Sequence, residues 1–292
     1  MKKGLTSIFF LLLLMNTALA QEQVAGAWMN FFYVKRTTVL IFLTGFVILF
    51  LIFLSLARKG KELYLRRIPG LDAIDEAIGR ATEMGKPVLF TNGLDPPSSI
   101  GTIAAINILS QVAQKTAQYE TTLRVPNEHP VTFVVEREVV KEAYAKAGKA
   151  DVYDPDSVYY IAGTQFAYAA AVSGYIVRER PATNLLLGVF YAESLIFAET
   201  GAATGAIQIA GTDAVTQLPF FVATCDYTLI GEELYAASAY ISRDPLHLSA
   251  IKTQDFFKAL SVLTMLFLLA SVYLLPRLGL PPNFLLNFLK GG

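Results

Sequence analysis

The sequence predicts an α/β fold, in which a Rossmann-like, mostly parallel sheet carries helices on both faces and is flanked by two transmembrane helices. Three observations predict it. Two long apolar runs stand near the two ends of the chain, helix-like and strand-like segments alternate between them, and the intervening residues 71–250 are numerous enough for one domain with its own core.

Composition favours placing part of the chain in lipid. The 292 residues are 54% hydrophobic and 16% charged, whereas soluble domains contain about 25% charged residues. Lys and Arg together number 24, as do Asp and Glu, so no net charge favours nucleic acid. The single cysteine, Cys225, excludes an internal disulfide, and with only two histidines we expect no metal site. No cofactor motif is recognised, and none is expected.

The first twenty residues predict a secretory signal peptide. Lys2 and Lys3 precede a short apolar core, and the small-x-small signal at Ala18 and Ala20 marks a cleavage site before residue 21. An uncleaved anchor is the alternative. Cleavage would leave residues 21–36 as a short extracytoplasmic segment.

Two further apolar runs predict membrane spans. Residues 37–57 contain no charge over 21 positions, and a spanning helix needs about 20 apolar residues. Residues 257–275 form the second predicted span, whose apolar core over 259–275 is shorter. Residues 276–292 would then be an extracytoplasmic tail.

Basic residues predict the orientation of the chain. Two cations precede the first span, whereas five follow it in the linker 58–70, namely Arg58, Lys59, Lys61, Arg66 and Arg67. Because positive flanks stay inside, we expect a multi-pass protein of the cell (inner) membrane with a cytoplasmic main domain. The same five cations could bind anionic lipid headgroups at about 1 kcal/mol each, although topology alone accounts for them.

Within residues 71–250, the segments alternate as they do in βαβ units. In the first half, the pattern predicts helices over 72–85, 98–118 and 138–147 and strands over 87–91, 121–125 and 131–135. In the second half, it predicts helices over 154–178, 193–200 and 229–240 and strands over 184–190, 206–210 and 220–224. The halves share this order, so an internal duplication is a hypothesis.

Local signals support these segments. Asp72 and Gly85 suit the start and the end of the first helix, and residues 87–91 form the continuous apolar run of a buried parallel strand. Pro155 suits the first turn of a helix, which makes Asp154 its expected N-cap.

The apolar stretch 161–177 has a second interpretation as a membrane span. Glu193 and Glu199 oppose extra spans, because a carboxylate at the bilayer centre costs at least ~2.5 kcal/mol.

The run RRIPGLDAIDEAIGRATEMGKPVLFTNG, residues 66–93, resembles the opening of an uncharacterised prokaryotic membrane-protein family of unknown function. The resemblance extends to about Asp244, through the segments AGTQFAYAAAVSGYIVRERPATNLLLGVFYAES and GTDAVTQLPFFVATCDYTLIGEELYAA. It implies membrane helices joined to a central domain. It implies no activity and no catalytic residues.

The candidate ligand site lies where predicted strands end, because ligands of open parallel sheets bind beyond the carboxyl ends of the strands. After the first strand come Asn92, Gly93, Asp95, Ser98 and Ser99, of which the serines begin a helix whose free N–H groups favour an anion. The loop is neither a Walker loop nor a Gly-x-Gly-x-x-Gly motif. A plain connection with capping serines and turn prolines is the simpler interpretation.

The second half offers corresponding positions. Glu193 and Ser194 follow one strand, and Thr212 and Asp213 follow another, although Glu193 and Ser194 also suit an ordinary helix start. Catalytic residues stay unassigned. Cys225 lacks a nearby histidine to activate it and is more simply a small apolar side chain.

These features lead to three function classes. The first is a membrane-anchored binding or assembly module that contacts lipid and associates with itself or with other membrane proteins, but not with nucleic acid. The second is a membrane-bound enzyme or a small-ligand or nucleotide sensor that uses the crevice at the strand ends. The third is a small transporter or channel, which requires residues 161–210 to span the membrane.

Overall fold

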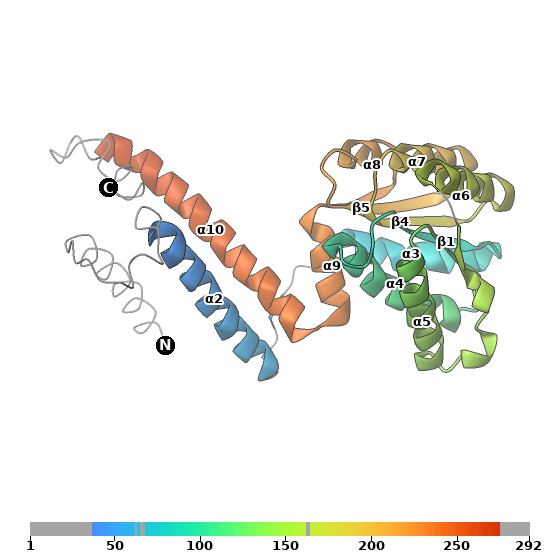
Figure 1. Ribbon diagram of the computed structural model, residues 1–292, viewed down its shortest axis with the longest axis horizontal. Helices are drawn as coiled ribbons and strands as arrows, with labels where there is room; N and C mark the ends of the chain where they lie inside the picture. Colours follow the sequence, from blue (N-terminus) through green and yellow to red (C-terminus); the bar gives the residue numbers. More distant parts are fainter. Residues whose placement is uncertain (1–36, 62, 65–67, 162–163, 275–292) are drawn as a thin grey trace. The chain divides into compact units, whose positions relative to one another are not determined.

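The computed structural model describes residues 37–61, 63–64, 68–161 and 164–274 (Figure 1). The predicted signal peptide, the segment 21–36 and the tail 276–292 lie outside the described residues, as do Arg66 and Arg67. The chain divides into two compact units. Tyr64–Asp244 forms one unit, and the two long apolar helices belong to the other.

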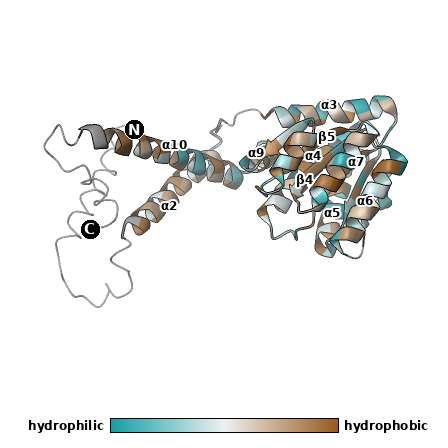
Figure 2. Ribbon diagram, turned by 90° about the horizontal axis from the view of Figure 1, so that it is seen from above, coloured by the Kyte–Doolittle hydropathy of each residue, from teal (hydrophilic) through white to brown (hydrophobic). Residues whose placement is uncertain are grey.

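The helical unit contains α2 (Thr37–Arg58) and α10 (Pro245–Leu274), which pack against each other with the rings of Phe46 and Phe257 5.3 Å apart. Both helices are long and apolar enough to cross a membrane. Figure 2 shows α2 as largely hydrophobic, while the N-terminal part of α10 carries hydrophilic residues. The helix α10 begins twelve residues before the predicted span at 257, because a polar helical stretch precedes the apolar one.

The other unit contains a sheet of six strands in the order β3-β2-β1-β4-β5-β6, in which every pair is parallel. The strands are β1 (Val88–Gly93), β2 (Leu123–Asn127), β3 (Val158–Tyr160), β4 (Thr183–Val189), β5 (Ile207–Thr212) and β6 (Tyr227–Ile230). This is the strand order of Rossmann folds. The predicted Rossmann-like α/β fold is therefore confirmed.

Helices cover both faces of the sheet because successive strand residues alternate between two buried clusters. Val88 and Phe90 join one cluster, with side chains of α3 (Pro69–Met84), α4 (Ile100–Gln118), α5 (Pro130–Lys146) and α9 (Glu232–Ser242). Leu89 joins the other, with side chains of α6 (Gln165–Glu179), α7 (Glu193–Thr204) and α8 (Leu218–Thr224). Figure 1 shows α6, α7 and α8 on one side of β4 and β5 and α4 and α5 on the other.

Two predicted strands are wrong in the same way. Residues 131–135 lie in α5 and residues 220–224 lie in α8. Each segment is rich in β-branched or aromatic residues, which favour strands. Each also has a proline, Pro130 or Pro219, in the first helical turn, where proline is well tolerated.

The edge strand β3 and the second half of the edge strand β6 occupy positions predicted as helix. The segment Pro155–Ser157 forms only a 3-10 turn, and β3 follows it directly, so the predicted helix over 154–178 begins at Gln165 instead. Similarly, β6 overlaps the start of the predicted helix over 229–240. With these corrections, each half has the order β-α-β-α-β, which is compatible with the duplication hypothesis.

The segment 161–210 belongs to the sheet unit. Its described residues form α6, β4, α7 and the first part of β5, and several of their side chains are buried against the sheet. Within the described part of the chain, α2 and α10 are the helices with the length and apolarity of a membrane span.

Candidate functional site

The carboxyl edge, meaning the edge at which the six strands end, brings both predicted groups of site residues together. The strand order reverses between β1 and β4, because α4 leaves β1 toward one face and α7 leaves β4 toward the other. Ligands of such sheets bind in the crevice at this switch point. Asn92–Ser99 follows β1, Glu193 follows β4, and Asp213 follows the next strand, β5.

We call the switch point between β1 and β4 the crevice, after the ligand site of such sheets, and its floor is backbone. The Leu94 amide donates to the Val189 carbonyl oxygen over 3.1 Å, so β1 and β4 stay joined past their ends. Gly93 has a φ of +83°, and a Cβ atom there would lie 1.8 Å from that carbonyl oxygen. On β4, a Cβ atom at Gly188 would lie 2.1 Å from the Asn92 carbonyl oxygen. The ends of β1 and β4 are therefore packed too closely for side chains at Gly93 and Gly188.

The first turn of α4 packs closely against the ends of β4 and β5. A Cβ atom at Gly101 would lie 2.6 Å from Val189 Cγ2 and 3.3 Å from Asp213 Oδ1. Ser99 occupies the N-cap position without a side-chain capping bond, and Ser98 is exposed. The Asp213 carboxylate thus lies beside a helix N-terminus, where the helix dipole favours a negative charge. The protein itself supplies an anion where the sequence predicts a bound one.

Two carboxylates at this edge are bonded to tyrosines. The Tyr191 hydroxyl donates to Asp95 Oδ1 over 2.8 Å, and the Tyr235 hydroxyl of α9 donates to Asp213 Oδ2. The hydrogen bond to Asp95 is the main reason that the pKa of Tyr191 is raised, with further contributions from its burial and from the charges of Asp95, Glu193 and Asp213. Three carboxylates therefore surround one exposed tyrosine, which makes the crevice acidic.

Glu193 and Ser194 are buried and hold the turn between β4 and α7. Glu193 accepts hydrogen bonds from Gln165 Nε2 at 2.6 Å and from the Tyr191 amide at 2.9 Å. The Ser194 hydroxyl lies 2.7 Å from the Tyr191 carbonyl oxygen and 2.7 Å from Gln217 Oε1. These contacts position Tyr191 above the crevice.

Other predicted residues lie deeper. Asn92 is buried, and its Oδ1 atom has no hydrogen-bond partner among the described residues. Thr212 is also buried and accepts a hydrogen bond from the Ala214 amide at 3.2 Å, which shapes the turn after β5. The surface of the crevice is therefore formed by Asp95, Asp213 and Tyr191 rather than by these two.

The sequence argument missed four contributors, which are Tyr191, Tyr235, Gln165 and Gln217. Only Tyr191 had a local signal, since it stands two residues before Glu193 and directly after the predicted strand 184–190. The hydrogen bonds of the other three join residues that stand 28, 23 and 22 positions apart, so no local pattern reveals them.

A row of exposed apolar side chains follows the carboxyl edge of the sheet, and we name it the carboxyl rim. One member stands at or shortly after the end of every strand: Ile100, Val131, Phe166, Tyr191, Val215 and Ile230. Ile100 is 68% exposed, Phe166 71% and Val215 78%. Exposed apolar side chains at every strand end of one edge favour an interaction surface there.

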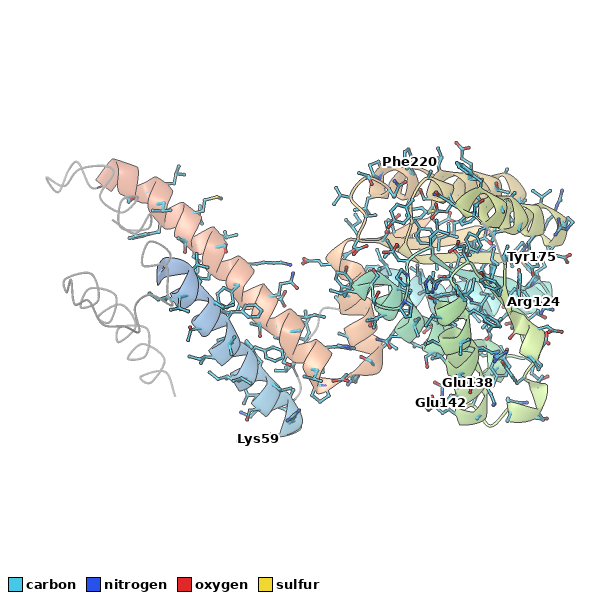
Figure 3. The ribbon with its side chains drawn as sticks, viewed as in Figure 1. Lys59, Arg124, Glu138, Glu142, Tyr175 and Phe220 are labelled. Atoms are coloured by element: carbon cyan, nitrogen blue, oxygen red, sulfur yellow. The ribbon has the colours of Figure 1, made fainter. Side chains whose placement is uncertain are left out.

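The remaining candidates lie elsewhere. Arg58, Lys59 and Lys61 are exposed at the end of α2, where Figure 3 shows Lys59. Burial raises the pKa of the Cys225 thiol to about 11, so this thiol stays protonated and poorly nucleophilic near neutral pH. Among the described residues, no group of three or more His, Cys, Asp or Glu side chains is placed to hold a metal ion.

Comparison with known proteins gives one match. The family described as a domain of unknown function (DUF6754) matches residues 27–275. No curated protein and no solved structure matches the chain.

Proposed function

Because this chain belongs to the DUF6754 family, whose function is unknown, we propose its function from its own geometry: it is a membrane-anchored binding or assembly module. In this proposal, α2 and α10 cross the membrane, and the sheet unit lies on the cytoplasmic side. Its binding surface is the carboxyl edge, and its partner is another membrane protein.

The carboxyl rim carries this proposal. Water disfavours a row of exposed apolar side chains, so covering Ile100, Phe166 and Val215 with a partner would be favourable. The carboxylates of Asp95 and Asp213 stand at the same edge and would select a cationic group by charge complementarity. The partner segment should therefore combine apolar side chains with lysine or arginine. Two copies of this edge would repel each other face to face.

A photo-crosslinking amino acid at Phe166 or Val215 of the full chain, in its native membranes, tests this surface. We expect a discrete crosslinked species at both positions. Adding the Asp95→Asn and Asp213→Asn substitutions should reduce its yield, because they remove charge with little change in shape. Mass spectrometry of the species should identify a partner segment with cationic and apolar residues.

Two exposed apolar residues away from the carboxyl edge serve as matched controls. Val177 lies near the end of α6 and Tyr119 follows α4, and each is about half exposed. Equal crosslinking at these control positions, or none at the rim, would contradict a binding surface at the carboxyl edge.

A small-ligand sensor or an enzyme is the second candidate, and the strand order favours it because the switch point is the usual ligand crevice of this fold. The hydroxyl of Tyr191 would have to release Asp95 for a ligand to reach the carboxylate. Ligand binding that is lost in Asp95→Ala, together with unchanged binding in the rim variants Phe166→Ser and Val215→Ser, would favour this candidate over the first.

The proposed orientation is tested by labelling a single cysteine. In a Cys225→Ala background, Glu142→Cys places a thiol on the exposed side of α5, far more accessible than the half-buried native cysteine. A membrane-impermeant maleimide should label inverted membrane vesicles and leave right-side-out vesicles unlabelled, because five cations follow the first span against two before it. Labelling of intact right-side-out vesicles would reverse the proposed topology.

A further inference from the structure

A second recess lies on the α6 side of the sheet, over β2 and β3. Its volume is about 800 Å³, in the range of pockets for small ligands. Pro87 and Thr122 line it just before β1 and β2, and Ile161 lines it just after β3, so the recess runs along the outer strands of the sheet. None of its lining residues belongs to the acidic crevice formed by Asp95, Asp213 and Tyr191.

The topology of the sheet explains why this recess is open. The chain leaves the edge strand β3, forms α6, and then returns to the centre of the sheet at β4. Helix α5 packs on β2 and β3 from the other face. On the opposite face of the sheet, the recess is bordered by one side of α6, which contributes Ala171, Tyr175 and Arg178.

Two arginines line the recess. Arg124 is fixed, because its Nη1 donates to Asp154 Oδ2 at 2.9 Å and to the Asp156 carbonyl oxygen at 3.0 Å. A guanidinium group has five N–H donors, so Arg124 retains donors for a ligand. Arg178 forms no ion pair with any described residue. Its Nη1 lies 2.9 Å from the place of a Cβ atom at Gly174, so the glycine leaves room for the guanidinium to lie along α6.

Two tyrosines and two carboxylates complete the lining. Tyr159 and Tyr175 are half-buried beside the arginines, and Figure 3 shows Tyr175 next to Arg124. Burial raises the pKa of Tyr175 to about 12, while the nearby Arg124 opposes that rise, so the phenol is neutral and its ring offers a flat face. Asp156 and Glu179 also line the recess and can accept hydrogen bonds from N–H or O–H groups.

We propose that this recess binds a nucleotide-like ligand, with an anionic phosphate on Arg124 and Arg178 and a planar ring against Tyr159 and Tyr175. Arginine recognises phosphate through paired N–H donors, and aromatic side chains stack on bases. The two carboxylates make a bare anion a poor fit, because they would repel it, whereas they suit the amino and hydroxyl groups of a nucleoside. The proposal does not depend on a partner at the carboxyl edge.

Calorimetric titration of the full chain in detergent with adenosine monophosphate, adenosine and inorganic phosphate tests the site. The nucleotide should bind more tightly than either fragment. Arg178→Met should weaken nucleotide binding by about tenfold or more, because a hydrogen bond to a charged group is lost, and should leave adenosine binding unchanged. Arg178→Lys should fall between the wild type and Arg178→Met, since lysine keeps the charge but not the paired donors.

Two variants distinguish this site from others. Arg80→Met removes an exposed arginine from α3 and should bind the nucleotide as the wild type does. Asp95→Ala in the acidic crevice should also leave that binding unchanged. The proposal is overturned if the wild type does not bind the nucleotide at millimolar concentration, if phosphate binds as tightly as the nucleotide, or if Asp95→Ala abolishes binding that Arg178→Met retains.

Discussion

Replacing Glu136 with glutamine is expected to stabilise the sheet unit at pH 8 and to flatten the decline in its stability between about pH 5 and pH 8. Glu136 lies on the buried face of α5 with no exposed surface. Neither carboxyl oxygen makes a hydrogen bond of normal geometry to a described residue. Burial raises the pKa of this carboxyl from 4.5 to about 8, and the Asn127 side chain opposes that rise more weakly.

The sign of the effect follows from the two pKa values. The folded protein keeps Glu136 protonated up to about pH 8, whereas the unfolded chain releases the proton near pH 4.5. Stability from this group is therefore complete below about pH 4.5 and is lost progressively until pH 8. One pKa unit corresponds to about 1.4 kcal/mol, so the loss amounts to a few kcal/mol. Glutamine carries no titrating proton, so the Glu136→Gln variant avoids this loss of stability.

Urea unfolding of the full chain in detergent, followed by circular dichroism from pH 5 to pH 8.5, measures this effect. The difference in unfolding free energy between Glu136→Gln and the wild type should grow with pH. Glu142→Gln on the exposed side of the same helix is the control (Figure 3); it removes an exposed ion pair with Lys146, which contributes little. Parallel pH profiles for Glu136→Gln and the wild type would show that Glu136 is charged in the folded protein.

Gly93→Ala should destabilise the sheet unit far more than Gly148→Ala does. Both glycines have a positive φ, +83° and +71°, so alanine pays a similar backbone cost of about 1–2 kcal/mol at each. A methyl group at Gly148 would meet open space, whereas at Gly93 it would lie 1.8 Å from the Val189 carbonyl oxygen. The ends of β1 and β4 would have to separate, which adds roughly 1–3 kcal/mol or more.

The same urea experiment measures both glycine variants at one pH. Gly93→Ala should lose more unfolding free energy than Gly148→Ala. This difference measures the steric contact between β1 and β4, because the cost of the backbone conformation is similar in both variants. Equal losses in the two variants would mean that β1 and β4 do not approach each other as closely as the structure has them.

The sequence could predict the class of fold because the strongest segments were also the most buried. The apolar runs at β1, β4 and β5 are recognisable without any tertiary information. The outer strands β3 and β6 were missed, since they contain only three and four residues and are partly exposed. Residues 131–135 of α5 and 220–224 of α8 were predicted as strands because valine and phenylalanine favour strands, although Pro130 and Pro219 in the first turns indicate helices.

The candidate site was predictable only in part. The rule that ligands bind at the ends of parallel strands placed Asp95, Glu193 and Asp213 at one edge. The partners of these carboxylates were beyond reach, because Gln165 and Tyr235 stand 28 and 22 residues away from them and belong to other helices. The arginine-lined recess depends on where α6 crosses the sheet, which requires the strand order.

The shortness of β3 and β6 has a consequence for how this protein can be recognised. A partner that extends a sheet by adding its own strand needs a long free row of backbone N–H and C=O groups. The edge strand β3 has three residues and the edge strand β6 has four, so each provides too few of these backbone groups. Recognition must then depend on side chains, whose chemistry can change one position at a time. Related chains could therefore share this architecture while differing in what they bind.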